Sequence, residues 1–367
     1  MTNNRLYSLD WLKGLMIICV VFYHSYLFPN FRGYLAVEVF FFISGYFMML
    51  SFIRRPTTAV MYTWERIKRV AAPYFLSIFI ICLFRSHIFT NADSFSSFVD
   101  RVSNAFSTLL FAEEFIPEEF RAVFINGGWF FSVLIISSFI LYGILQFNER
   151  LATTVLFPII ILLGYNALMS QSETVCNFER IGLLGAPLIR GLFEMAAGAF
   201  ICHIYMSYKT SLEKWSTLIN ILGLVSLIIF LSLMFTEQAQ DKYLIITIPW
   251  FIIASVLDNS WLNKALQKIN GGLIARIGRY TIYVLCIHGL AEQIVFACND
   301  LFLHNALEGT LLLIVYLIAA TIATFVLYHL CQFANKLICS RPKGSLYLTN
   351  ENPTDIKEDS DPKQHEK

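Results

Sequence analysis

Residues 9–24 read LDWLKGLMIICVVFYH and begin an apolar stretch that continues to about residue 28. At about 100° per helical residue, Asp10 and Lys13 return to nearly the same face as His24. Ionisable groups inside a membrane-spanning helix are costly unless they face a polar cavity. One interpretation is that the stretch lines a functional site. The alternative is that the Asp10 and Lys13 side chains extend to the membrane surface and that His24 finds a hydrogen-bond partner on a neighbouring helix.

The composition of the chain is typical of a multi-pass membrane protein. Of 367 residues, 57% are hydrophobic and only 14% are charged, and the mean hydropathy is +0.61. We expect an all-α integral membrane protein built as a bundle of about ten transmembrane helices, because a bilayer core requires about 20 apolar residues per helix. The candidate stretches lie near residues 9–28, 34–53, 70–90, 128–147, 152–170, 188–208, 217–235, 243–257, 278–299 and 309–335.

The distribution of basic residues predicts the orientation of the bundle. A cytoplasmic N-terminus places most of the 27 Lys and Arg residues on the inner side, including those in loops 54–69 and 258–279. This distribution of basic residues agrees with the positive-inside rule and leaves the acidic loop 91–127 outside. We expect two cytoplasmic termini, a membrane domain over residues 1–338 and a disordered cytoplasmic tail over residues 339–367.

Other sequence features narrow the class of protein further. The first apolar stretch has no small-residue cleavage site, so it is not expected to be a signal peptide. The eight cysteines have no paired spacing and mostly lie in apolar runs, which favours buried thiols over disulfides or metal ligands. The chain contains no Gly-rich phosphate loop. We expect no metal, no permanently bound cofactor and no nucleic-acid partner.

His24 and Glu38 are the candidate catalytic pair. They lie at similar distances before and after the turn at 29–33, so two antiparallel helices would hold them at similar depth. A carboxylate beside an imidazole orients the ring and stabilises its protonated form, as a general base requires. The alternative is a structural ion pair between neighbouring helices. Ser44, followed by Gly45, is better explained by close helix packing than by a role as nucleophile.

Arg66 and Arg69 are candidates for binding an anion. They are three residues apart on one helical face at the inner loop, where guanidinium groups can grip phosphates bidentately. Lys13 is expected at the same side of the membrane. The alternative is ordinary anchoring by basic residues at the cytoplasmic surface.

Six segments, in this order, resemble the acyltransferase-3 family of membrane-bound bacterial acyltransferases, over about residues 6–335. They are LDWLKG with VVFYH, VEVFFFISGYF, WERIKRVAAPYF, GGWFFSVLIISSFILY, IRGLFEMAAGAF and IGRYTIYVLCIHGL. The family's hallmark is an Arg or Lys that is followed, after ten intervening residues, by a His. In this chain the motif falls on Lys13 and His24, although lysine is the less usual choice. Its Arg-x-x-Arg pattern falls on Arg66 and Arg69, and its acidic position on Glu38.

The resemblance also implies an activity and further cavity-lining residues. Members transfer an acyl group, usually acetyl, from cytosolic acyl-coenzyme A (acyl-CoA) to a hydroxyl of an envelope glycan or lipid-linked saccharide. This chain resembles the stand-alone type, which has no esterase-like domain, in the bacterial inner membrane. His24 would act as a general base or carry the acyl group itself. Possible cavity-lining residues, from the resemblance and from positions near the candidate pair, are Asp10, Ser44, Trp129, Arg190, Glu194, Tyr283 and His288.

Two other classes of function remain compatible with the sequence. A proton-coupled secondary transporter would also carry ionisable residues at membrane depth, but the chain shows no similar halves and no pair of corresponding broken helices. A non-catalytic membrane protein of envelope assembly would have no use for a paired histidine and glutamate.

Overall fold

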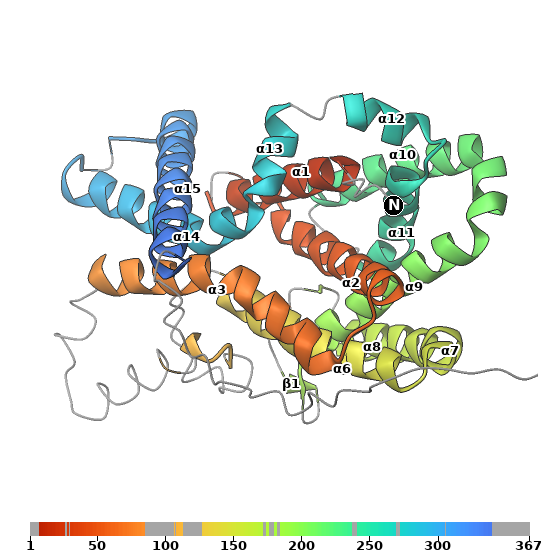
Figure 1. Ribbon diagram of the computed structural model, residues 1–367. Helices are drawn as coiled ribbons and strands as arrows, with labels where there is room; N and C mark the ends of the chain where they lie inside the picture. Colours follow the sequence, from red (N-terminus) through yellow and green to blue (C-terminus); the bar gives the residue numbers. More distant parts are fainter. Residues whose placement is uncertain are drawn as a thin grey trace, which may run out of the picture.

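The computed structural model is an almost entirely helical assembly (Figure 1). The structure describes residues 7–25, 28, 30–84, 106, 108–112, 127–171, 174–175, 180–181, 184–236, 241–268, 272–304 and 306–339. Most of the acidic loop at 91–127 and the predicted tail after residue 339 therefore lie outside the described residues.

Each of the ten apolar stretches overlaps a helix. These helices are α1 (Tyr7–Tyr23), α2 (Ala36–Arg54), α3 (Ala59–Phe84), α6 (Gly128–Phe147), α8 (Phe157–Gln171), α9 (Ala186–Lys214), α10 (Ser216–Leu233), α11 (Leu244–Val256), α14 (Thr281–Leu301) and α15 (Gly309–Cys339). Shorter elements join them: η1 (Gly33–Leu35), α7 (Glu149–Leu151), η4 (Ala152–Leu156), β1 (Arg180–Ile181), β2 (Leu184–Gly185), η5 (Asp241–Tyr243), α12 (Trp261–Lys268) and α13 (Leu273–Arg279). Strands β1 and β2 pair antiparallel.

Seven helical segments in the described part of the chain are long and apolar enough to cross a membrane. They are Gly33–Arg54, Gly128–Phe147, Glu149–Gln171, Ala186–Lys214, Ser216–Leu233, Thr281–Leu301 and Gly309–Lys336. Helix α1 has 17 residues and α11 has 13, fewer than the roughly 20 of a full span. The molecule is therefore a multi-pass membrane protein, while the count of about ten transmembrane helices stays a prediction.

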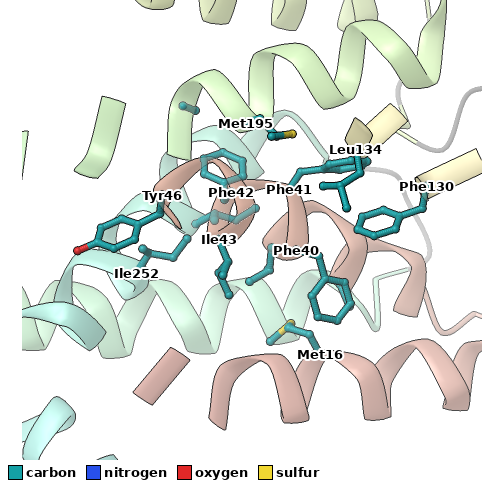
Figure 2. Packing of buried hydrophobic residues seen from close by; sticks show 14 of the residues in the cluster. Met16, Phe40, Phe41, Phe42, Ile43, Tyr46, Phe130, Leu134, Met195 and Ile252 are labelled. Carbon is teal, nitrogen blue, oxygen red and sulfur yellow. The ribbon is translucent and has the colours of Figure 1, made fainter. Parts of the chain in front are cut away.

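Helix α2 lies at the centre of the bundle and makes its closest contact with α9. A methyl group added at Gly45 would lie 1.9 Å from the Met195 carbonyl oxygen, and one at Gly198 would lie 1.9 Å from that of Phe42. Only glycine lets the two backbones approach this closely, so the packing role expected for Gly45 is confirmed. Figure 2 shows Phe42 directed toward Met195 of α9, and Phe40 toward Met16 of α1.

A second backbone contact joins α1 to α13. A methyl group at Gly278 would lie 1.7 Å from the Asp10 carbonyl oxygen, and one at Gly14 would lie 1.9 Å from the Ile274 carbonyl oxygen. Residues 258–279 were expected to form a loop, but most of them fold into α12 and α13. The basic residues Arg276 and Arg279 lie in the last turn of α13.

Candidate functional site

His24 lies at the C-terminal end of α1, where its backbone N–H donates to the Val20 carbonyl oxygen at 3.2 Å. Its imidazole ring lies against the ring of His288 on α14, with 4.9 Å between the ring centroids. Its Nδ1 atom is 3.9 Å from Oε2 of Glu292 on the same helix. The His24 side chain is 22% exposed, whereas His288 is 1% exposed. Of the two rings, His24 is therefore the one that a substrate can reach.

The hydrogen bond of His288 determines which of its nitrogens carries the proton. Nδ1 lies 2.9 Å from the Val284 carbonyl oxygen, which can only accept, so Nδ1 is the donor. In the neutral ring, Nε2 then carries a lone pair; it is buried and has no hydrogen-bond partner among the described residues. Glu292 follows His288 by four residues, so both project from one face of α14 toward His24. His24, His288 and Glu292 thus form one cluster, in which His24 is the most exposed member.

The structure corrects the expected pairing of His24 with Glu38. The Glu38 carboxylate is bound by Arg190 of α9, whose Nε donates to Oε2 at 2.9 Å and whose Nη2 forms an ion pair with Oε1. Both residues are almost completely buried. A buried carboxylate requires a full opposite charge and hydrogen bonds, which a forked guanidinium supplies better than an imidazole. Glu38 therefore forms a buried ion pair with a partner 152 residues away, rather than with His24.

Arg190 has further contacts with two residues that the family resemblance indicated. Oε1 of Glu194, one turn further along α9, lies 3.9 Å from Nε of Arg190. The Arg190 guanidinium also lies over the ring of Trp129 at 5.1 Å from its centroid, a cation–π contact. Arg190, Glu194 and Trp129 are thus brought together around Glu38.

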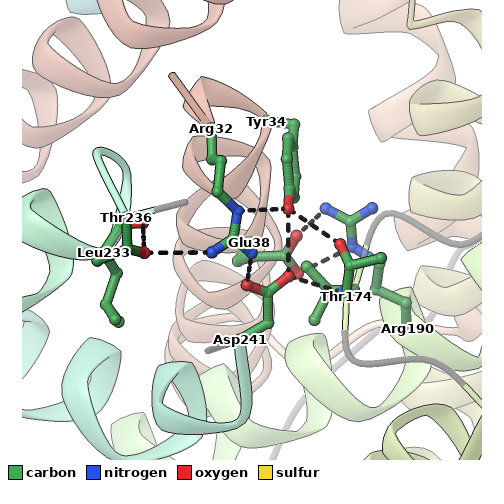
Figure 3. Close-up of polar contacts among 9 residues, drawn as sticks. Arg32, Tyr34, Glu38, Thr174, Arg190, Leu233, Thr236 and Asp241 are labelled. Carbon is green, nitrogen blue, oxygen red and sulfur yellow. Dashed lines mark hydrogen bonds and ion pairs between the residues drawn. The ribbon is translucent and has the colours of Figure 1, made fainter. Parts of the chain in front are cut away.

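A second buried ion pair, between Arg32 and Asp241, lies close to this group (Figure 3). Nε of Arg32 donates to the Tyr34 hydroxyl at 2.9 Å, and that hydroxyl also contacts Thr174 at 2.9 Å. The backbone N–H of Val175 donates to Asp241 at 2.8 Å. Burial disfavours the charge of Arg32, but the hydrogen bond to Tyr34 and the charge of Asp241 outweigh it and raise the arginine pKa above its ordinary value. This network ties the start of α2 to η5.

The three candidates for binding an anion have separate surroundings. Lys13 forms an ion pair with Asp10, with 2.7 Å between Nζ and Oδ1, and Asp10 is buried. Arg66 points toward α6, where its Nη1 donates to the Ser138 hydroxyl at 2.8 Å. Arg69 is exposed. The charge of Lys13 is therefore already balanced in part by the Asp10 carboxylate, whereas the Arg69 side chain is exposed and accessible to a ligand.

The remaining candidates are less closely tied to His24. Ser44 is half-buried on α2 next to Gly45. Tyr283 packs against the rings of Tyr280 and Tyr328, with centroids 6.2 and 5.3 Å away. The described residues contain no group of three His, Cys, Asp or Glu side chains that could hold a metal ion. All the cysteines whose side chains are described are free thiols.

Sequence reasoning missed Glu292, Arg32 and Asp241. Glu292 could have been found, because its spacing of four residues from His288 places both on one helical face. Arg32 and Asp241 are 209 residues apart, and no local pattern joins them.

In a comparison with known protein families, a family model described as an acyltransferase domain matches residues 6–329, nearly the whole chain. No curated protein and no solved structure shows significant similarity to the chain.

Proposed function

Since this chain belongs to the acyltransferase-3 family, we propose that it transfers an acyl group, usually acetyl, from acyl-CoA to a hydroxyl of an envelope glycan or lipid-linked saccharide. Acyl-CoA would be a co-substrate that binds and is released in each catalytic cycle, rather than a permanently bound cofactor. The proposal joins the family match to one feature of the structure, the cluster of His24 with His288 and Glu292.

In the proposed reaction His24 acts as the general base. It takes the proton of the acceptor hydroxyl, and the oxygen attacks the thioester carbonyl carbon. The carbon–sulfur bond then breaks, and the proton passes from His24 to the departing coenzyme A sulfur. Glu292 supports this cycle because a carboxylate 3.9 Å from Nδ1 stabilises the imidazolium that forms. In the second form of the mechanism His24 itself carries the acyl group, and Glu292 has the same stabilising role.

The donor is proposed to approach from the cytoplasm. In this proposal both termini lie on the cytoplasmic side of the bacterial inner membrane. Lys13, Arg66 and Arg69 would then lie toward the cytoplasmic face, where they would hold the phosphates of coenzyme A. His24 follows Lys13 by eleven residues, or about 16 Å along a helix axis. A thioester reaching outward from the phosphates would therefore meet an acceptor that enters from the opposite side.

Glu38 and Arg190 are assigned a positioning role in this proposal. Their ion pair joins α2 to α9, the same two helices whose glycines bring the backbones into contact. A rigid α2 fixes the position of its neighbour α1 and therefore of His24.

The test uses inverted membrane vesicles that contain the full chain, supplied with acetyl-CoA labelled in the acetyl group. We expect label to enter the lipid-linked saccharide or glycan fraction, and His24→Ala to remove that incorporation. The control variant is His203→Ala, which changes a half-buried histidine on α9 outside the cluster. Equal incorporation by His24→Ala and the wild type, at equal abundance, would contradict the assignment of His24.

A further inference from the structure

A groove of about 320 Å³ runs between α1, α14 and α15, and the end of α13 supplies part of its wall. This volume falls at the lower end of the range of ligand-binding pockets, roughly 300–1,000 Å³. On α1 the wall begins at Ile17 and ends at Val21, which precedes His24 by less than one helical turn. The groove therefore follows the segment of α1 that connects Lys13 with His24.

The wall on α14 places one end of the groove at the histidine cluster. Val284 lines the groove, and its carbonyl oxygen accepts the hydrogen bond from Nδ1 of His288. At the other end Tyr280 lines the groove and packs against Tyr328 of α15. Tyr280 precedes His288 by eight residues, or about 12 Å of helix. A ligand that fills the groove would thus reach from the start of α14 to the imidazole rings.

The wall is largely apolar but also carries hydroxyl groups. Its polar members are Thr321, Thr324, Tyr280 and Tyr328. The Thr321 hydroxyl donates to the Leu317 carbonyl oxygen at 2.7 Å, whereas the Thr324 hydroxyl is buried and has no hydrogen-bond partner among the described residues. A plain hydrocarbon chain would leave that buried hydroxyl unpaired, which is costly. The groove therefore suits a mainly apolar chain that carries amide groups.

Two arginines of α13 lie at the end of the groove that is farther from His24. Arg276 and Arg279 come directly before two residues of the groove wall, Ile277 and Tyr280. Both arginine side chains are exposed, and neither forms a hydrogen bond or ion pair with another described residue. Because they are three residues apart, their guanidinium groups share one helical face and can bind phosphate bidentately.

The contact between α1 and α13 places these arginines on the same side of the bundle as Lys13. Gly14, which follows Lys13, packs directly on the backbone of α13. The charge of Lys13 is balanced in part by Asp10. In the described part of the chain, Arg276 and Arg279 therefore supply positive charge at this end that no carboxylate balances.

We propose that this groove holds the pantetheine arm of the acyl-CoA donor, with the donor phosphates bound by Arg276 and Arg279 and one pantetheine amide bound by Thr324. This inference rests on the proposed function and deepens it, because it assigns donor-binding roles to α13 and α15. Pantetheine combines methyl and methylene groups with two amides, which matches apolar walls that carry a few hydroxyls. The arm can span about 12 Å of helix, so the thioester lies beside His24 while the phosphates stay at α13.

The experiment measures donor binding and does not require an acceptor. The purified full chain in lipid nanodiscs binds tritium-labelled coenzyme A, which is then displaced by acetyl-CoA or by S-acetylpantetheine. The second compound contains the arm and the thioester but no phosphate. The arginine variants are Arg276→Gln and Arg279→Gln, and their matched control is Lys264→Gln, which removes an exposed positive charge from α12. The groove variant is Thr324→Val, with Thr324→Ser as the change that keeps the hydroxyl.

We expect each arginine variant to bind acetyl-CoA about tenfold more weakly or worse, because it loses a charge-assisted hydrogen bond, and to bind S-acetylpantetheine as the wild type does. Thr324→Val should weaken binding of both compounds by the same factor, about threefold to tenfold. Thr324→Ser and Lys264→Gln should bind both compounds as the wild type does.

Unchanged acetyl-CoA binding in the two arginine variants, or in Thr324→Val, would overturn the inference. An equal loss for both compounds in the arginine variants would overturn it too, because it would indicate a change in the fold rather than in phosphate binding. So would an equal loss in Lys264→Gln, which would assign the effect to surface charge in general. A wild type that binds no coenzyme A would contradict the proposed function together with the inference. A wild type that binds coenzyme A and transfers acetyl groups, with variants that bind normally, would contradict the inference alone.

Discussion

The imidazole of His24 lies between two residues of a single helix, with its ring 4.9 Å from that of His288 and its Nδ1 atom 3.9 Å from the Glu292 carboxylate. The two partners are one helical turn apart, so the orientation of α14 determines both contacts together. His288 is locked by its bond to the Val284 carbonyl oxygen, and this leaves Glu292 as the charged partner of His24.

Glu292→Gln should lower kcat without a comparable change in KM for acyl-CoA. The amide keeps the shape of the side chain but no longer stabilises a positive imidazole. We expect a loss smaller than that of His24→Ala, for which removal of a general base costs about 10²–10⁴-fold. Steady-state kinetics on purified protein measure both parameters. Glu308→Gln, at an exposed position, is the control, and an equal loss in that variant would show that Glu292 has no special role.

Glu38→Gln should act on stability and abundance rather than on catalysis. Removing one partner of a buried ion pair leaves the other charge uncompensated, at a cost of about 3–5 kcal/mol. Thermal unfolding in detergent should therefore shift to lower temperature. The triple variant Glu38→Leu, Arg190→Met and Glu194→Gln removes the ion pair together with the second carboxylate beside Arg190, and should recover much of that loss. A Glu38→Gln protein with wild-type thermal stability and sharply lower kcat would instead return Glu38 to a catalytic role.

Lys13 can be tested through its ion pair with Asp10. If Lys13 binds a phosphate of the donor, Lys13→Gln should raise KM for acyl-CoA, and Lys13→Arg should largely preserve it. Asp10→Asn combined with Lys13→Gln removes both charges of the pair. KM should stay raised in this double variant, whereas a return to the wild-type value would mean that Lys13 only neutralises Asp10.

The orientation of the bundle predicts opposite labelling of two loops. Cysteines introduced singly at Thr58, which is exposed, and at Ser96, in the predicted external loop, should differ in reaction with a membrane-impermeant maleimide on intact cells. We expect labelling at position 96 only. The background must lack the native thiols, because Cys298 is exposed. Labelling at position 58 from outside would reverse the proposed entry side of the donor.

Helices were predictable from this sequence because their main determinant is local. An apolar stretch that crosses a membrane has to form its backbone hydrogen bonds within its own segment, and each of the ten stretches does overlap a helix. The bounds of one differ clearly: α3 begins at Ala59, eleven residues before the expected start at residue 70 and inside the expected loop 54–69. The prediction of a loop over 258–279 was wrong because α12 and α13 have only eight and seven residues and each carries two basic side chains, and composition alone does not separate such short helices from a loop.

The candidate site was only partly predictable, because its contacts join distant segments. His24 was identified from its position in the first apolar run and His288 from the family motif, and the structure places their rings together. Glu38 was a reasonable partner for His24, because the two residues were expected at similar depth in adjacent helices. The competing charge, Arg190, lies 152 residues later, and no spacing rule connects it to Glu38. Local periodicity predicts which residues share a helical face, but not which neighbouring helix that face meets.

The backbone contact between Gly14 and α13 has a consequence for the synthesis of the protein. A ribosome that adds about 5–20 residues per second takes on the order of tens of seconds to proceed from Gly14 to Gly278. Throughout that interval the nascent α1 lacks α13 and α14, which pack against Gly14 and His24 in the finished protein. The histidine cluster can assemble only after α14 has emerged from the ribosome, so a chain that terminates before that helix lacks the cluster altogether.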